Sequence, residues 1–132
     1  MARELGARER IPAIGFALGV ERLLMLLGDR EVAAPSVPVF LAVSSPRFAE
    51  EAFRWKVRLA RRGIRAEMDY EGRSLRGQFK RADRVGARFA VVFGEAEEAR
   101  DAVALKDLAR GEQRVIGKSE ALEEIARRVG EA

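Results

Sequence analysis

Two glycines and one arginine near the start of the chain have the types and spacing needed to bind a nucleotide. In the string from Pro12 to Arg22, Gly15 and Gly19 lack side chains, so a flat ring or a phosphate could approach the backbone. Arg22 lies one turn into a predicted helix, where its planar guanidinium could bind phosphate oxygens. A strand–turn–helix corner, whose glycines permit close packing, shows the same pattern. These residues alone leave both interpretations open.

A second candidate is the concentration of positive charge in the middle of the chain. The segment from Arg54 to Arg88 holds 12 Lys or Arg against 4 Asp or Glu, whereas the remaining residues hold 13 bases and 17 acids. The segment therefore carries an excess of +8 and the remainder −4, which together give the net charge of +4. A basic cluster favours polyanions because each neutralised phosphate releases condensed counterions. A solvated helical face rich in arginine is the alternative that charge alone leaves open.

The composition excludes several other kinds of chemistry. The 132 residues include no cysteine and no histidine, so they hold no disulfide, no thiolate nucleophile and no Ser/His catalytic pair. We expect no metal site, because the commonest metal ligand is missing. Apolar runs such as 23–27 are far shorter than the roughly 20 residues of a membrane-spanning helix, and no signal sequence is evident. We therefore expect a cytoplasmic protein that does not bind membranes.

The elements that must position these residues follow from hydrophobic spacing. Strands are predicted at 37–44, 64–68, 88–93, 103–107 and 113–116. Helices are predicted at 45–62, at 75–86 with Ser74 as its N-cap, and from Ser119 onward. The inward stripe of the first helix is predicted to comprise Ala49, Ala52, Phe53, Val57 and Ala60.

This order of elements predicts an α/β fold, a five-stranded mixed sheet with a parallel centre and helices on both faces. Ligands of such sheets meet the loops beyond the carboxyl ends of the parallel strands, here near Ser44, 69–73 and 94–97.

Residues 1–30 form a separate part, which ends at a predicted linker over 31–37. A strand is predicted at 11–16 and a helix at 19–28. This orphan helix is apolar nearly all round, because positions 20 and 23–27 are all apolar. Exposing several such side chains to water would cost several kcal/mol, at about 25 cal/mol per Å². We therefore expect the helix at 20–27 to pack on the α/β unit or on a second copy, as a homodimer.

Two segments resemble the histidyl-tRNA synthetase family. GFALGVERLLMLL at 15–27 is similar to motif 3 of class II aminoacyl-tRNA synthetases in its histidyl form. GRSLRGQFKRADRVGARFAVVF at 72–93, Gly94-Glu95 and VALKDLARGEQ at 103–113 resemble the anticodon-binding domain of the same family. The resemblance covers about residues 11–129 in the order of the family. It implies that 1–30 is the C-terminal remnant of a class II catalytic domain and 38–132 an anticodon-binding domain.

The resemblance also implies a role for each matching residue. In the family the motif 3 arginine binds an ATP phosphate, so Arg22 would take that role. The residues that would shape the ATP site around it are Gly15, Gly19 and Glu21. The residues implied to contact the anticodon are Glu71, Arg73, Arg76, Gln78, Lys80, Arg81, Glu95, Glu97 and Lys106. The cations among them would bind phosphates, and the Gln and Glu side chains could bind base edges. Tyr70 beside the loop could stack on an unpaired base or line the rim of the core.

One departure from the family decides the expected activity. Motif 1, motif 2 and the histidine-recognition loops have no counterpart in these residues, and a synthetase must hold ATP, magnesium and the amino acid together. We therefore expect no aminoacylation and no cofactor for this chain alone, although the parent enzymes use ATP and magnesium. The leading hypothesis is an anticodon-binding module for histidine tRNA. The alternatives are a truncated paralogue that acts in regulation or protein interaction without reading tRNA, and a portion of a full enzyme.

Overall fold

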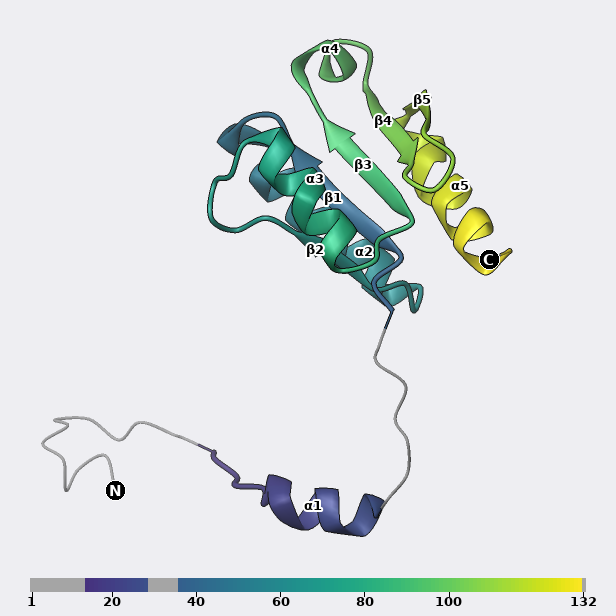
Figure 1. Ribbon diagram of the computed structural model, residues 1–132. Helices are drawn as coiled ribbons and strands as arrows, with labels where there is room; N and C mark the ends of the chain where they lie inside the picture. The colour runs from purple at the N-terminus through teal and green to yellow at the C-terminus, as the bar shows by residue number, and fades with distance from the viewer. Residues whose placement is uncertain (1–13, 29–35, 132) are drawn as a thin grey trace, which may run out of the picture. The chain divides into compact units, whose positions relative to one another are not determined.

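The computed structural model describes residues 14–28 and 36–131 of the 132-residue chain. The chain divides into two units, Met1–Ala33 and Ala34–Ala132. The first unit contains the helix α1 (Val20–Leu27), and the second contains all of the described strands (Figure 1). Most of the predicted linker, residues 31–35, and residues 11–13 of the first predicted strand lie outside the described residues.

The helix α1 forms where the sequence predicts it. Gly19 is its N-cap, and the carbonyl of Gly19 accepts a hydrogen bond from the backbone N–H of Leu23 at 3.2 Å. Gly28 ends the helix with φ of +59°, a conformation that favours glycine. Residues 14–16 form no strand, contrary to the prediction, because among the described residues of this unit no second strand is present to pair with them.

The second unit is built on a five-stranded mixed sheet in the order β2-β1-β3-β4-β5. The strands are β1 (Val39–Val43), β2 (Ala66–Met68), β3 (Phe89–Phe93), β4 (Ala102–Asp107) and β5 (Glu112–Gly117). Strand β1 pairs in parallel with β2 and β3, whereas β3–β4 and β4–β5 are antiparallel. The predicted five-stranded mixed sheet with a parallel centre is confirmed.

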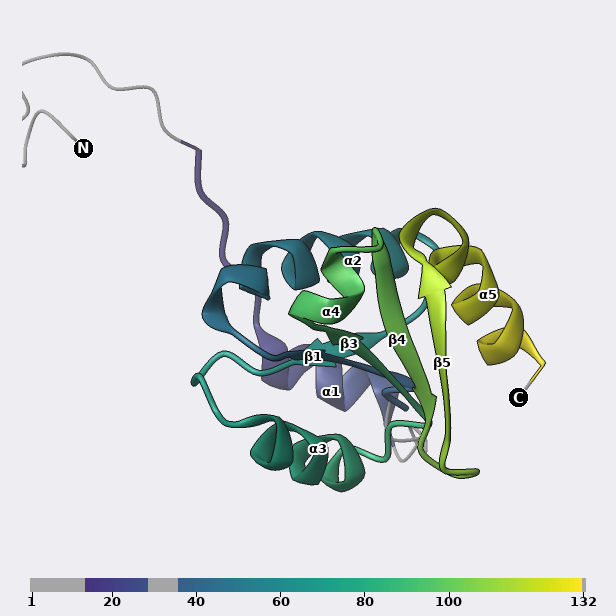
Figure 2. The same ribbon diagram turned by 90° about the horizontal axis from the view of Figure 1, so that it is seen from above.

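Helices cover both faces of the sheet (Figure 2). The short 3₁₀ helix η1 (Pro46–Phe48) leads into α2 (Ala49–Arg61), which shares one face with α5 (Lys118–Gly130), and α3 (Leu75–Arg84) lies on the other. The strand order reverses at β1, and right-handed crossovers in opposite directions place α2 and α3 on opposite sides. A short helix that the sequence did not predict, α4 (Glu95–Glu98), follows the carboxyl end of β3 (Figure 1). None of the described helices has the length and apolarity to cross a membrane.

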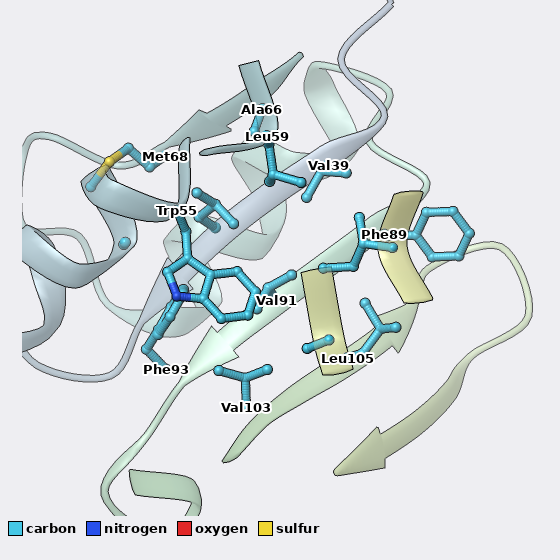
Figure 3. Packing of buried hydrophobic residues seen from close by; sticks show 14 of the residues in the cluster. Val39, Trp55, Leu59, Ala66, Met68, Phe89, Val91, Phe93, Val103 and Leu105 are labelled. Atoms are coloured by element: carbon cyan, nitrogen blue, oxygen red, sulfur yellow. The ribbon is translucent and has the colours of Figure 1, made fainter. Parts of the chain in front are cut away.

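The larger core lies between the sheet and the pair α2 and α5 (Figure 3). Trp55 of α2 is 2% exposed and meets the ring of Phe93 edge to face, with 5.3 Å between ring centroids. Val91 and Val103 fill the space beside the two rings. A smaller cluster under α3 contains Phe40, Ala42, Ala82 and Ala87.

The predicted inward stripe of α2 is wrong at three positions. Phe53 is 51% exposed, Val57 is 38% exposed and Ala60 is also exposed. The buried residues of η1 and α2 are Phe48, Ala52, Trp55 and Leu59. These positions have the same helical spacing as the predicted stripe, so periodicity cannot choose between the two. Burying the largest rings and Leu59 removes more apolar surface from water, which favours the observed stripe.

The last helix begins earlier than predicted. Gly117 is the N-cap of α5 and Lys118 is already helical, so Ser119 lies inside the helix and does not cap it. The buried residues of α5 are Ala121 and Ile125.

Candidate functional site

A cavity of about 640 Å³ opens at the carboxyl ends of β1 and β2. It lies beside the position where the strand order reverses, which in open α/β sheets is the usual place for a ligand. The sequence analysis expected a ligand at this edge of the sheet. The segments that line the cavity are 43–46, the first turns of α2 with Phe53, 68–70, 72–74 and Gln78.

Two exposed aromatic rings belong to the walls of this cavity. Phe53 is 51% exposed and Tyr70 is 60% exposed, although large apolar rings are normally buried. The hydroxyl of Tyr70 accepts a hydrogen bond from Lys56 Nζ at 2.7 Å, and Lys56 Nζ also lies 3.3 Å from Glu67 Oε1. Partial burial lowers the pKa of Lys56, but the bonds to Tyr70 and Glu67 outweigh it and raise that pKa above its ordinary value. The ammonium therefore stays charged and holds the phenol ring in place.

A buried carboxylate fixes the loop below these rings. Asp69 Oδ2 accepts a hydrogen bond from the backbone N–H of Arg73 at 2.8 Å, and Oδ1 accepts one from Arg73 Nη1 at 2.6 Å. Burial would raise the pKa of Asp69, but the bonds from Arg73 outweigh it and hold that pKa below its usual range. The other end of the guanidinium pairs with Glu71. Arg73 and Glu71, both implied to contact RNA, are thus already bonded to the protein.

The side chain of Gln78 connects the end of β1 to the loop before α3 through hydrogen bonds. It is 1% exposed, its Oε1 accepts a hydrogen bond from Val43 N at 2.9 Å, and its Nε2 donates to Val43 O at 2.9 Å and to Arg73 O at 2.8 Å. The structure therefore places it between β1 and the loop before α3, with its amide hydrogens used, and not where a base edge could reach. Gln78 lies three residues after Leu75 and four before Ala82, so helical spacing places it on the same face as these two apolar residues. This signal in the sequence could have identified Gln78 as buried.

The remaining predicted cations lie on and beside α3. Ser74 caps the helix as predicted, since its Oγ accepts a hydrogen bond from Gly77 N at 3.3 Å. Arg76 and Lys80 are exposed, whereas Arg81 is half-buried and its Nε has no hydrogen-bond partner among the described residues. Lys106 on β4 lies over the ring of Phe79, with its Nζ 4.9 Å from the ring centroid.

The two predicted residues of α4 lie outside the cavity lining. Glu95 is exposed and its Oε1 is 3.9 Å from Arg47 Nε. The side chain of Glu97 folds back over Gly94, where a Cβ atom would collide with the Glu97 carboxylate. The structure therefore separates these two carboxylates from Tyr70 and Gln78.

The first unit carries the residues implied to bind ATP. Glu21 and Arg22 are exposed on the first turn of α1. The stem of Arg22 lies 3.7 Å from the position that a Cβ on Gly19 would take, and a Cβ on Gly15 would meet no atom within 4 Å. Residues 14–28, including Gly15 and Arg22, are all exposed. Within 14–28 and 36–131 no cluster of carboxylates is arranged to hold a metal ion.

Comparisons with known proteins agree with the fold. Residues 38–128 match the family described as "Anticodon binding domain". The chain is 40% identical over 116 residues to the histidine–tRNA ligase of Syntrophotalea carbinolica. The aligned region covers 88% of this chain and 27% of the relative. It is also 45% identical over 104 residues to the histidine–tRNA ligase of Geobacter sulfurreducens. This aligned region covers 78% of this chain and 25% of the relative.

Two solved structures show the same arrangement of elements. The apo histidyl-tRNA synthetase of S. aureus matches with a TM-score of 0.66 and 29% identity, over 81% of this chain and 28% of that one. The histidyl-tRNA synthetase of Nostoc sp. PCC 7120 matches with a TM-score of 0.64 and 30% identity, over 85% of this chain and 28% of that one. The chain thus spans about a quarter of the length of these relatives. It belongs to the anticodon-binding domain family, and its relatives there are histidyl-tRNA synthetases.

Proposed function

We propose that the chain binds the anticodon loop of histidine tRNA, and that an unpaired base enters the cavity at the carboxyl ends of β1 and β2. The observation that carries the proposal is the pair of exposed rings, Phe53 and Tyr70, at a cavity within the matched domain. Base–aromatic stacking suits unpaired nucleotides, which RNA-binding proteins read in loops. A role with tRNA would place the chain in the cytoplasm.

The other residues of the cavity would serve this binding in different ways. Asp69 and Gln78 hold the loop and the end of β1 in one geometry, so they position the site without touching RNA. Arg76 and Lys80, exposed on α3, would neutralise phosphates. The hydroxyls of Ser44 and Ser45, which form no side-chain hydrogen bond with any residue that the structure describes, could bond a base edge at the cavity. Sequence analysis placed Ser44 at the ligand-binding edge of the sheet but gave no binding role to Ser45 or Phe53.

A binding measurement with the anticodon stem-loop of histidine tRNA tests this function. Fluorescence anisotropy should show binding that weakens steeply as salt is raised, because phosphate contacts release counterions. Tyr70→Ala should weaken binding about tenfold or more, since one stacked base contributes about 1–3 kcal/mol. An RNA with an altered anticodon should also bind more weakly.

The matched control is Val57→Ala, which shortens an exposed apolar residue of α2 outside the cavity lining and should leave affinity unchanged. Equal affinity for the altered anticodon would refute specific reading by this chain. Failure of the unmodified chain to bind RNA in dilute buffer would favour the alternative, a paralogue that acts through protein contacts.

We infer that the first unit acts in nucleotide binding only within a longer protein. Arg22 would hold a phosphate of ATP and Gly15 would lie under the adenosine, but magnesium and the amino acid need ligands that a longer chain would supply. The chain alone should therefore show only background charging of tRNA in an aminoacylation assay.

We also propose that α1 of this chain is covered by α1 of a second copy. None of its residues is buried, and Leu24, Met25 and Leu26 are among its most exposed side chains. Pairing two such helices would remove this apolar surface from water. Light scattering should give the mass of a dimer, and Met25→Glu should convert it to a monomer. A monomeric unmodified chain would contradict the proposal.

A further inference from the structure

Tyr70 is an exposed ring whose orientation is not set by close packing. It belongs to the wall of the cavity, it is 60% exposed, and it is the only tyrosine of the chain. An exposed aromatic side chain samples several rotamers, and a base that stacks on it must select one of them. The affinity of the cavity therefore depends on the groups that hold this ring in the free protein.

Lys56 of α2 holds the ring although it does not line the cavity. Its Nζ donates a hydrogen bond to the hydroxyl of Tyr70 at 2.7 Å and lies 5.2 Å from the centroid of the ring. The hydroxyl is the atom of the side chain farthest from the backbone. A hydrogen bond at this atom therefore restricts rotation about the first side-chain torsion of Tyr70.

Glu67 of β2 fixes the lysine in turn. A lysine stem is flexible, so its ammonium can position another group only when it is itself fixed. Glu67 Oε1 lies 3.3 Å from Lys56 Nζ and also accepts a hydrogen bond from the backbone N–H of Met68 at 3.2 Å. Glu67 is paired with Phe40 of β1 in the register of the sheet. The chain of contacts that ends at the ring of Tyr70 therefore begins at the sheet.

The ammonium of Lys56 has little capacity left for a direct contact with RNA. Of the three N–H donors of a lysine, one is used by Tyr70 and one by Glu67. The two side chains of the ion pair are 29% and 28% exposed, so water screens their attraction less than that of a fully exposed pair. These contacts favour an action of Lys56 through Tyr70 over a contact with a phosphate.

We propose that Lys56 and Glu67 are positioning residues for RNA binding, which hold the ring of Tyr70 in the orientation on which a base stacks. The proposal deepens the proposed function and rests on it, because Tyr70 must contact RNA for its orientation to affect affinity. The ring is then ordered when the chain folds, and binding does not have to restrict it. Neither Lys56 nor Glu67 is among the residues that the family resemblance implies.

A double-mutant cycle tests the proposal by fluorescence anisotropy with the anticodon stem-loop. The pair variant combines Lys56→Met with Glu67→Gln, which removes the ion pair and leaves the net charge unchanged. It should weaken binding about threefold to tenfold, the factor expected when one side chain must be ordered on binding. The slope of affinity against salt should stay the same, because no net charge is lost.

The second arm of the cycle is Tyr70→Phe, which keeps the ring and loses only the hydroxyl. It should weaken binding by the same factor as the pair variant. Because both changes break the same chain of contacts, combining them should cause no further loss of affinity. The matched control combines Arg62→Met with Glu123→Gln, which removes an ion pair between the end of α2 and α5. Neither residue lines the cavity, so affinity should stay that of the unmodified chain.

A spectroscopic measurement separates positioning from a general loss of structure. Because the chain has one tyrosine, NMR relaxation of isotope-labelled tyrosine reports on the ring of Tyr70 alone. The order parameter of this ring should fall in the pair variant, while the midpoint of urea unfolding changes little. An unchanged order parameter would contradict the proposal.

Two binding results would also overturn it. One is a pair variant that binds like the unmodified chain, and the other is losses from the pair variant and Tyr70→Phe that multiply, which would mean that Lys56 acts on RNA directly. In either case a loss of affinity in Tyr70→Ala leaves the proposed function intact. If the pair variant does not fold, Tyr70→Phe alone decides, since unchanged affinity would refute a role for the hydroxyl. Absence of RNA binding by the unmodified chain would reject the proposed function, and this inference with it.

Discussion

Trp55→Ala should lower the free energy of unfolding by about 3–5 kcal/mol, the usual cost of truncating a buried aromatic side chain to alanine. Trp55 is 2% exposed and packs edge to face on Phe93, so its removal leaves a cavity between α2 and the sheet. Because a small domain has only about 5–15 kcal/mol of stability, a large fraction should be lost. Urea unfolding followed by circular dichroism measures the change.

Phe53→Ala is the matched control on the same helix, two positions away. Phe53 is half exposed, so its truncation should cost less than about 1 kcal/mol. It should nevertheless weaken RNA binding, since Phe53 belongs to the wall of the cavity. If the two variants are destabilised equally, the assignment of the inward face of α2 is wrong.

Asp69→Asn should cost about 2 kcal/mol near neutral pH, because the neutral amide accepts weaker hydrogen bonds from Arg73 than the carboxylate does. The pKa of Asp69 is lower in the folded chain than in the unfolded one. Its stabilising contribution is therefore complete above about pH 5 and is lost as the pH falls through the folded pKa. The stability difference between the unmodified chain and Asp69→Asn should shrink over that acid range.

The control for this comparison is Asp83→Asn, which removes an equal charge from an exposed position of α3. Its unfolding curve should stay close to that of the unmodified chain at every pH. A difference for Asp69→Asn that does not change between pH 7 and the acid range would refute the role given to the carboxylate.

The sequence predicts the sheet well because its signals there are local. The alternation of Ile64, Ala66 and Met68 identifies β2, and Ser74 identifies the start of α3. The edge that carries the cavity also follows from the order of elements, since the reversal at β1 is a property of the topology. Positions along the chain were therefore easier to predict than the side that each residue faces.

The side chains of the site could not be predicted as well, because polar residue type does not specify burial. Gln78 and Arg73 were expected to contact RNA. Instead, the amide of Gln78 donates hydrogen bonds to the carbonyls of Val43 and Arg73, and the guanidinium of Arg73 donates to Asp69. Phe53 was expected inside because an equally regular stripe competed with the observed one. Only the tertiary arrangement reveals which of two equivalent helical faces meets the sheet.

The three hydrogen bonds of Gln78 have a thermodynamic consequence for any molecule that enters the cavity. They tie the last residue of β1 to the loop before α3, so the surrounding backbone is already ordered in the free protein. Association then loses little conformational entropy at this rim, and the gain from stacking and desolvation is retained as affinity. The cavity is preorganised by a buried side chain whose amide group is bonded to the protein itself.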